Sequence, residues 1–152
     1  MATFKGNMDA ELMIIIEKAE DFHGHIGPFL VIGARMGLIG VRRLGVKKNN
    51  EELRVTVMTK PFTPFSCVID GIQVATHCTI GNKKLRLKNS SRIAARFKFL
   101  DEKQVTVTVN SAVLDRLKEL LSKDSSPEEV QKLAKTVASM PEEELFIIER
   151  SR

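Results

Sequence analysis

The residues of this sequence that could do chemistry gather in two short segments. His23 and His25 flank a glycine, and a stretch that begins at Cys67 and ends at Cys78 carries one thiol at each end. In an extended or turn segment, the two rings of a His-x-His pair point the same way, so both can face one site. Imidazole and thiolate together suit Zn²⁺ or another divalent transition metal. The two segments therefore predict a metal site or a reactive thiol.

The second segment carries a polar stripe on a short helix that we predict over 66–76, with Ser66 as its candidate N-cap. Cys67 and Asp70 are three residues apart, and so are Asp70 and Gln73, which places all three on one helix face. The Asp70 carboxylate could orient a ligand histidine or act as acid/base beside a metal-bound water. Cys67 and Asp70 are therefore our candidate catalytic residues.

Cys78 lies just past this helix, and we expect it to reach the same pocket as Cys67. Simpler interpretations stay open for each residue. A buried cysteine is often inert packing, and the two thiols could also pair as a disulfide. His23 and His25 could merely cap a helix start, His77 is expected to be exposed, and the polar stripe could cap neighbouring backbone. No Cys-x-x-Cys pattern supports a zinc site directly.

Two helices must position the histidines. Apolar residues recur at helical spacing over 9–21, where Asn7 or Asp9 is the candidate cap. A second helix is predicted over 28–44, because Pro28 suits its first position and Gly45 its end. The histidines then lie at the N-terminus of this second helix, which favours anions and thiolates.

Three glycines lie inside the predicted helix over 28–44, at Gly33, Gly37 and Gly40. Each costs a helix about 1 kcal/mol relative to alanine, so we expect another backbone or a ligand to approach them closely. Packing within one chain would explain the glycines, and so would a subunit interface.

The rest of the sequence predicts a single α+β domain over 1–152, with helices packed on an antiparallel sheet. Alternating apolar residues give the sheet one buried face and one wet, basic face. A proline-containing loop is expected at 60–66, a turn at 77–82 and a tight hairpin at Asp101-Glu102. The remaining expected elements are strands at 52–59, 84–88, 92–99 and 103–109, helices at 111–122 and from the capping box at 126 to about 140, and an apolar strand or docking segment at 145–148.

Charge is uneven along the 152-residue chain, whose formal net charge is +5. The segment 83–98 contains seven basic side chains and no acidic one, so it could meet an anionic partner or simply form a solvated sheet face. The chain has no Trp or Tyr to stack on bases, so nucleic acid is not the expected partner. No apolar run approaches the roughly 18 residues of a membrane span, and no leader is apparent, so we expect a cytoplasmic protein.

Several of these segments together resemble the formylmethanofuran dehydrogenase E-subunit (FmdE) family. The family opens on Phe-His-Gly-His, an apolar residue and Cys-Pro-Gly, and then has a glycine-containing helix; its second motif joins a cysteine to Asp-Ala-Ile-Gln and Gly-Cys-Thr-x-Gly-Lys. The similar segments here are Phe22–Pro28, Gly33–Gly37, Cys67–Gln73, His77–Asn82 and Met140–Phe146. Because no cysteine follows Cys78, we expect the core domain without the C-terminal zinc ribbon of some members.

The sequence departs from the family pattern at the positions that matter most for a metal site. Gly27 stands where the family has its first cysteine, and Phe29 stands where it has the following glycine. His77 and Asn82 replace a glycine and a lysine. We hypothesise that His77 substitutes for the lost thiol. The candidate metal ligands are then His23, His25, Cys67, His77 and Cys78, with zinc or another divalent transition metal as the cofactor.

The resemblance implies an α+β core, an intertwined homodimer and a metal-binding groove built from the two motifs. The family name points to the molybdenum or tungsten enzyme that reduces CO₂ onto methanofuran in methanogenic archaea. A metal-binding enzyme or accessory subunit in one-carbon or molybdopterin-linked metabolism is therefore the leading hypothesis, with a small-molecule substrate and a larger oxidoreductase complex as partners. The alternatives are a non-catalytic binding or metal-sensing module that uses its basic sheet face to bind an acidic partner or nucleic acid, and a purely structural subunit.

Overall fold

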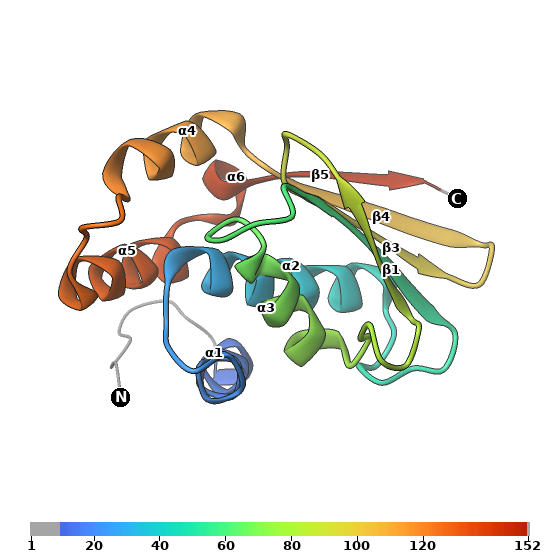
Figure 1. Cartoon of the computed structure of the whole chain (residues 1–152). Coiled ribbons are helices and arrows are strands. Elements are labelled where there is room, and N and C mark those ends of the chain that lie inside the picture. The colour runs from blue at the N-terminus through green and yellow to red at the C-terminus, as the bar shows by residue number, and fades with distance from the viewer. Residues whose placement is uncertain (1–9, 152) are drawn as a thin grey trace.

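The computed structural model describes residues 10–151, so the candidate cap residues Asn7 and Asp9 lie outside the described residues. The chain forms helices and strands in a mixed order (Figure 1). The helices are α1 (Ala10–His23), α2 (Pro28–Leu44), α3 (Cys67–Thr76), α4 (Ser111–Leu120), α5 (Pro127–Ser139) and α6 (Glu142–Leu145). The strands are β1 (Leu53–Thr59), β2 (Leu85–Asn89), β3 (Ala94–Phe99), β4 (Lys103–Val109) and β5 (Phe146–Ser151).

Helix α2 is the centre of the molecule. Its sequence is apolar almost all round, which is typical of a fully buried helix. One side of α2 packs on β3 and β4, and α1, α3 and α5 pack against its other sides (Figure 1). The helix has the predicted bounds, with Pro28 at its first position and Gly45 in the left-handed conformation at its end.

The five strands form one sheet in the order β2-β1-β3-β4-β5. Neighbours from β1 to β5 pair antiparallel, as the sequence predicted. The exception is β2, which pairs parallel with β1. The sheet is therefore mostly antiparallel, and the expected α+β fold is confirmed; β2 is parallel because α3 crosses over between β1 and β2 and returns the chain in the same direction.

The two faces of the sheet differ as predicted. Val55, Val57, Ala95 and Phe97 point toward the helices and are fully buried. The opposite face carries polar and basic side chains between them, such as the exposed Arg54 and Lys98 on adjacent strands. One face thus builds the core and the other is wet and basic.

The close approach that the glycines predicted is to elements of the same chain. A Cβ at Gly33 would collide with the backbone carbonyl of Val68 in α3, and a Cβ at Gly71 would collide with backbone atoms of α2. Gly37 faces Ala75 of α3, and Gly40 faces the Phe97 ring. The glycines therefore serve packing within one chain, and their interpretation as a subunit interface is wrong.

Local signals at the helix ends are mostly confirmed. Ser126 and Glu129 form the predicted capping box of α5. Ser66 precedes α3 but makes no side-chain capping hydrogen bond, so that prediction is wrong. The apolar segment predicted at 145–148 is a strand, because Phe146–Ser151 adds to the sheet beside β4.

We predict that Gly33→Ala destabilises the protein although alanine is the better helix former. If the space beside position 33 were open, the change to alanine would raise the free energy of unfolding by about 1 kcal/mol through helix propensity. The added Cβ would instead collide with the Val68 carbonyl, and the backbones of α2 and α3 would have to separate. We therefore expect the free energy of unfolding to fall by about 1–3 kcal/mol. Urea unfolding followed by circular dichroism measures the difference. A variant as stable as the wild type would contradict the close crossing of α2 and α3.

Candidate functional site

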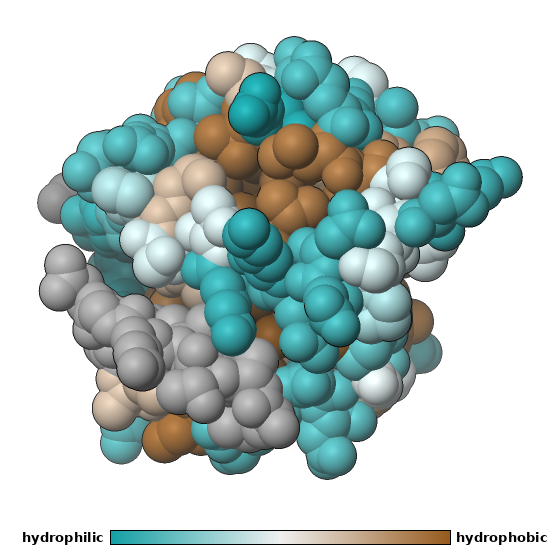
Figure 2. Space-filling view, turned by 90° about the vertical axis from the view of Figure 1, so that its left-hand side faces the viewer, coloured by the Kyte–Doolittle hydropathy of each residue, from teal (hydrophilic) through white to brown (hydrophobic). Residues whose placement is uncertain are grey.

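A pocket with a volume of about 670 Å³ opens where the N-terminal turns of α2 and α3 meet the loop at 60–66 and the α4–α5 connection. This size is within the range of small-molecule sites. Figure 2 views the side of the molecule on which α4 and α5 lie, and it shows an apolar hollow bordered by hydrophilic side chains. The residues that line the pocket are His23, His25, Gly27, Pro28, Phe29, Leu30, Thr63, Pro64, Cys67, Leu121, Ser122, Lys123 and Val130.

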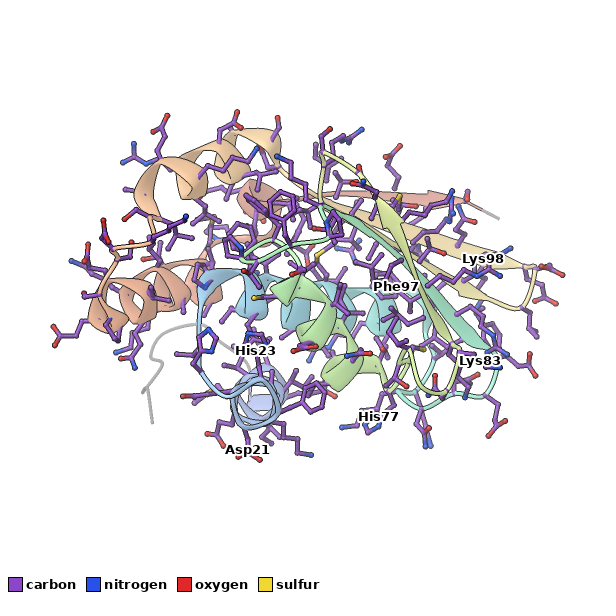
Figure 3. The ribbon with its side chains drawn as sticks, in the orientation of Figure 1. Asp21, His23, His77, Lys83, Phe97 and Lys98 are labelled. Atoms are coloured by element: carbon purple, nitrogen blue, oxygen red, sulfur yellow. The ribbon has the colours of Figure 1, made fainter. Side chains whose placement is uncertain are left out.

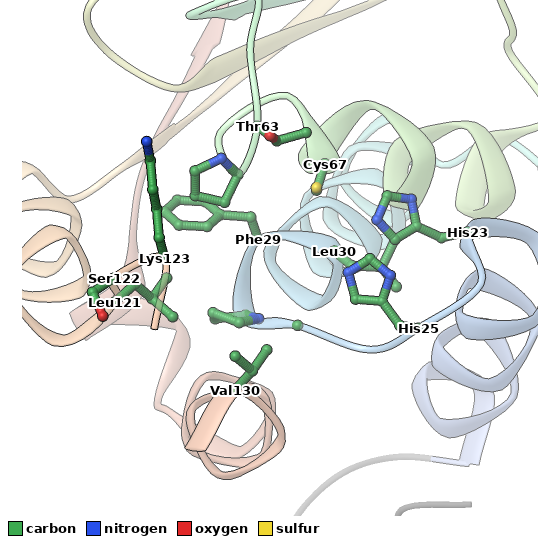
Figure 4. A pocket seen from close by; sticks show the side chains of 13 residues that line it. His23, His25, Phe29, Leu30, Thr63, Cys67, Leu121, Ser122, Lys123 and Val130 are labelled. Atoms are coloured by element: carbon green, nitrogen blue, oxygen red, sulfur yellow. The ribbon is translucent and has the colours of Figure 1, made fainter. Parts of the chain in front are cut away.

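The two histidines of the first motif lie side by side in this pocket (Figure 4). His23 is the last residue of α1, and Gly24 reverses the chain with a φ of 101°. A side chain at Gly24 would be strained in this conformation, which explains the glycine. The imidazole centroids of His23 and His25 are 4.7 Å apart, so the predicted pairing of the two rings is confirmed.

The two ring nitrogens of His23 have different surroundings, since a carboxylate holds one of them and no described residue forms a hydrogen bond with the other. His23 Nδ1 lies 2.6 Å from Asp70 Oδ2, across the junction between α1 and α3. A carboxylate accepts, so Nδ1 carries the hydrogen, and a neutral ring then presents a lone pair at Nε2. His23 Nε2 is buried and has no hydrogen-bond partner in the part of the chain that the structure describes. This arrangement is the one found where a carboxylate orients a metal-ligating histidine.

Asp70 is in turn held by the polar stripe that the sequence predicted. Gln73 Nε2 donates to Asp70 Oδ1 at 3.3 Å, and Gln73 Oε1 accepts from the backbone N–H of Ile80 at 3.0 Å. Asn82 closes the following turn by accepting from Thr79 N–H and donating to the carbonyl of His77. The second motif thus fixes the carboxylate that fixes His23.

Cys67 supplies the thiol of the pocket. It is the first residue of α3, is half-buried, and lies close to both histidines in Figure 4. Burial, and secondarily the negative charge of Asp70, raise the pKa of this thiol above its ordinary value. The thiol therefore stays protonated at neutral pH unless a cation lies beside it, and it is not an activated nucleophile by itself.

Cys67 is the first residue of α3, whereas His77 caps the other end of this helix (Figure 3) and Cys78 follows His77 in the chain. A ten-residue helix is about 15 Å long, which separates the two thiols. Cys78 is 1% exposed, its Sγ lies 3.5 Å from the carbonyl oxygen of Leu53, and neither cysteine forms a disulfide. The expectation that Cys78 reaches the pocket is wrong, because the intervening residues are helical and not folded back.

His77 is not placed to substitute for a lost ligand of the pocket. It is exposed, as predicted, and adopts the left-handed conformation with a φ of 62° at the end of α3. Partial burial of its ring and the charges of Lys48 and Lys18 lower its pKa, so the imidazole is neutral at physiological pH. The hypothesis that His77 replaces the family's first cysteine is therefore not supported by its position.

The structure thus brings together His23, His25, Cys67 and Asp70 from the predicted set. Among residues 10–151, no three His, Cys, Asp or Glu side chains converge closely enough to hold a metal ion as they stand. Gly27 lines the same pocket in an extended conformation (φ −153°, ψ 170°) that any residue can adopt. A Cβ there would lie 3.4 Å from Val130 Cγ1, so the backbone leaves room for a side chain.

Sequence reasoning missed the apolar walls of the pocket. Leu121, Lys123 and Val130 come from the α4–α5 connection and from α5, far from both motifs in the sequence. Phe29 and Pro64 complete the wall from α2 and from the loop at 60–66. The sequence offers no periodic signal for these contacts, since only the tertiary fold brings the segments together.

We predict that Asp70→Asn lowers the pH at which Cys67 is alkylated in metal-free protein. Removing the carboxylate charge lowers the pKa of the thiol, so more thiolate is present at a given pH. Burial, the larger cause, still keeps the pKa above that of a free thiol. Rates of iodoacetamide labelling between pH 7 and about 10, read by peptide mass spectrometry, measure the change.

Cys78 is the internal control in this labelling, because its burial keeps it unmodified while the protein is folded. Equal labelling profiles for Asp70→Asn and the wild type would show that the Asp70 charge does not act on the thiol.

Comparisons with known proteins agree with this fold. A family model described as "FmdE, Molybdenum formylmethanofuran dehydrogenase operon" matches residues 22–147. A protein of Archaeoglobus fulgidus named "Probable S-adenosyl-L-methionine-binding protein" is 35% identical over an alignment of 116 residues, and the match covers 70% of this chain and 30% of that protein. The chain thus spans less than a third of the length of this relative.

A solved structure is similar over almost the whole chain. It is a tungsten formylmethanofuran dehydrogenase FmdE-like protein from Syntrophus aciditrophicus, with a TM-score of 0.61 and 18% sequence identity, and the match covers 93% of this chain and 72% of that one. At this identity the likeness shows the fold. The family match, which covers most of the chain including both motifs, identifies the protein: it belongs to the FmdE family.

Proposed function

We propose that this chain is a metal-dependent, small-molecule-binding member of the FmdE family. In this proposal His23, His25 and Cys67 hold a divalent transition metal, and zinc is the first candidate. The observation that carries the proposal is the buried His23 Nε2 atom, which has no hydrogen-bond partner within residues 10–151 while Asp70 holds the other ring nitrogen. A buried polar atom without a partner is costly, so a ligand for this lone pair is expected.

The donor set fits zinc in type and number. Two imidazoles and one thiolate are common zinc ligands, and catalytic zinc sites keep a fourth position open. The exposed His25 ring and the half-buried Cys67 side chain can turn toward His23, which stays fixed by Asp70. A bound cation would also offset the burial and the Asp70 charge that keep the Cys67 thiol protonated.

Asp70 acts in this proposal as a positioning residue. Both of its oxygens already accept a hydrogen bond, one from His23 and one from Gln73, which suits a residue that holds His23 in place. Cys67 acts as a metal ligand. A zinc ion in such a site would supply Lewis-acid activation of a water or a substrate oxygen.

Family membership supports a role related to formylmethanofuran dehydrogenase, as an enzyme or an accessory subunit in one-carbon metabolism. The pocket volume of about 670 Å³ suits a small-molecule substrate beside the metal. S-adenosyl-L-methionine is one candidate, because it is named for the longer relative from Archaeoglobus fulgidus.

We expect the purified wild-type protein to bind about one zinc per chain, as catalytic sites do. His23→Ala and Cys67→Ala remove donors, and Asp70→Asn loosens His23, so each should weaken zinc binding by about 10–100-fold. Competition with a chromophoric chelator and elemental analysis after gel filtration measure affinity and stoichiometry. In cobalt-loaded protein, the sulfur-to-cobalt absorption band should vanish in Cys67→Ala.

Two variants sharpen this test. His77→Asn tolerates the left-handed conformation at position 77 and should leave zinc binding unchanged. Gly27→Cys adds a thiol where the backbone has room, and it should raise zinc affinity by at least about tenfold, whereas Gly27→Ser should raise it less. Zinc that binds neither the wild type nor Gly27→Cys would overturn the proposal.

A second candidate function rests on the open face of the sheet. Arg54, Arg86, Lys88, Arg96 and Lys98 share this face on β1, β2 and β3. Among residues 10–151, only Lys98 of these five forms an ion pair, with its neighbour Asp101 at 3.6 Å. Such a surface suits docking onto an acidic protein, including a larger oxidoreductase, by a chain that need not be catalytic.

We predict that this face binds poly-L-glutamate with an affinity that falls steeply as salt rises. Arg86→Gln with Arg96→Gln should weaken binding by about fivefold or more at low salt, because both cations face the partner. The control, Lys132→Gln with Lys135→Gln on α5, removes the same net charge elsewhere. Fluorescence anisotropy measures both, and an equal loss in the two variants would mean that net charge alone, not this face, attracts the polymer.

A further inference from the structure

We propose that the outer half of the pocket binds a ligand with a flat apolar body and an anionic group, either a phosphate or a carboxylate. The inference rests on the proposed function in one respect, namely that the pocket takes a small molecule. It adds the chemical class of that molecule, which neither the metal donors nor the family membership specifies.

The pocket has two chemically different ends (Figure 4). His23, His25 and Cys67 form the inner end, whereas Lys123 stands on the opposite side with Phe29 between them. The stretch between the two ends is apolar, so a ligand that reaches from one to the other needs an apolar body.

An aromatic shelf, which we define as Phe29, Phe65 and Phe62, leads from the pocket wall to the surface. Phe29 meets Phe65 edge to face with ring centroids 5.3 Å apart, and Phe65 meets Phe62 in the same way at 5.8 Å. Phe29 is buried, but Phe62 is 54% exposed. A large aromatic side chain left this open beside a pocket offers a stacking surface for a flat ring.

A lysine rim, which we define as Lys60, Lys118 and Lys123, consists of two lysines over the shelf and one in the pocket wall. Lys60 Nζ lies 5.9 Å from the Phe62 centroid and 5.3 Å from that of Phe65, and Lys118 Nζ lies 5.7 Å from the latter. Lys123 lines the pocket itself. None of the three forms an ion pair with a residue in 10–151. Two of these cations therefore lie over the aromatic shelf and the third lines the pocket, a distribution that favours an anionic ligand and disfavours a cationic one.

A purely structural explanation also exists, in which the lysine stems only cover the phenylalanine rings. The two explanations differ in the role of charge. Methionine keeps an apolar stem over the rings but removes the ammonium group, so Lys60→Met with Lys118→Met separates them. The matched control is Lys132→Met with Lys135→Met, two exposed positions on the outer side of α5.

The probes are 2-naphthyl phosphate, 2-naphthoate and 2-naphthol, which share one aromatic body and differ in charge. We expect at least one of the two anions to bind the wild type about tenfold or more tightly than 2-naphthol, as titrated by NMR shifts or calorimetry. The double lysine variant should reduce this ratio to about twofold, and the α5 control should leave it unchanged. Phe62→Ala should weaken all three probes.

Comparing the phosphate with the carboxylate identifies which anion the lysine rim prefers. Equal binding of all three probes would overturn the inference, and so would a ratio that survives the double lysine variant. Each titration is run with chelator and again with added zinc. An anion preference that persists in chelator supports the lysine rim as the anion site, even if no metal site exists. A preference that is seen only with added zinc shows that the anion binds the metal, and it overturns the inference.

Discussion

The close crossing of α2 and α3 is the constraint on which the site depends. Gly33 and Gly71 let the two backbones touch near the first turns of both helices. Because the helices meet there, the N-terminal residues of α3 lie beside the chain that leads into α2. This crossing brings Cys67 and Asp70 next to His23, although 47 residues separate Asp70 from His23 in the sequence.

The polar contacts of the site form a chain that starts from this crossing. The turn after α3 holds Gln73 through Ile80, Gln73 holds Asp70, and Asp70 holds His23. Each link limits the rotation of the next, so the His23 ring is fixed while its Nε2 atom has no hydrogen-bond partner among the described residues 10–151. A rigid donor at the end of a hydrogen-bonded chain is what a binding site needs, whereas a ring that only caps a helix would not need this support.

The elements of the fold could be predicted closely wherever local signals were strong. The helix over 28–44 and the strand over 103–109 have the predicted bounds, because proline, glycine and strict alternation mark them. The parallel pairing of β2 could not be predicted, since it depends on how α3 crosses the sheet. For the site, the spacing predicted the pairing of the two histidines correctly but misplaced Cys78. Cys78 is only eleven positions after Cys67 in the sequence, but the residues between them form α3, which keeps the two thiols apart.

Gly27 connects the two halves of the pocket. Its extended backbone does not require glycine, and the space beside it ends at Val130 of α5. A thiol there, as in the family pattern, would add a metal donor but would narrow the path between the histidines and the apolar outer wall. The glycine removes one donor and enlarges the room for a ligand. In the function proposed above, the glycine at this position therefore favours small-molecule binding over closed metal coordination, because it leaves the path open between His23, His25 and Cys67 at one end of the pocket and Lys123 at the other.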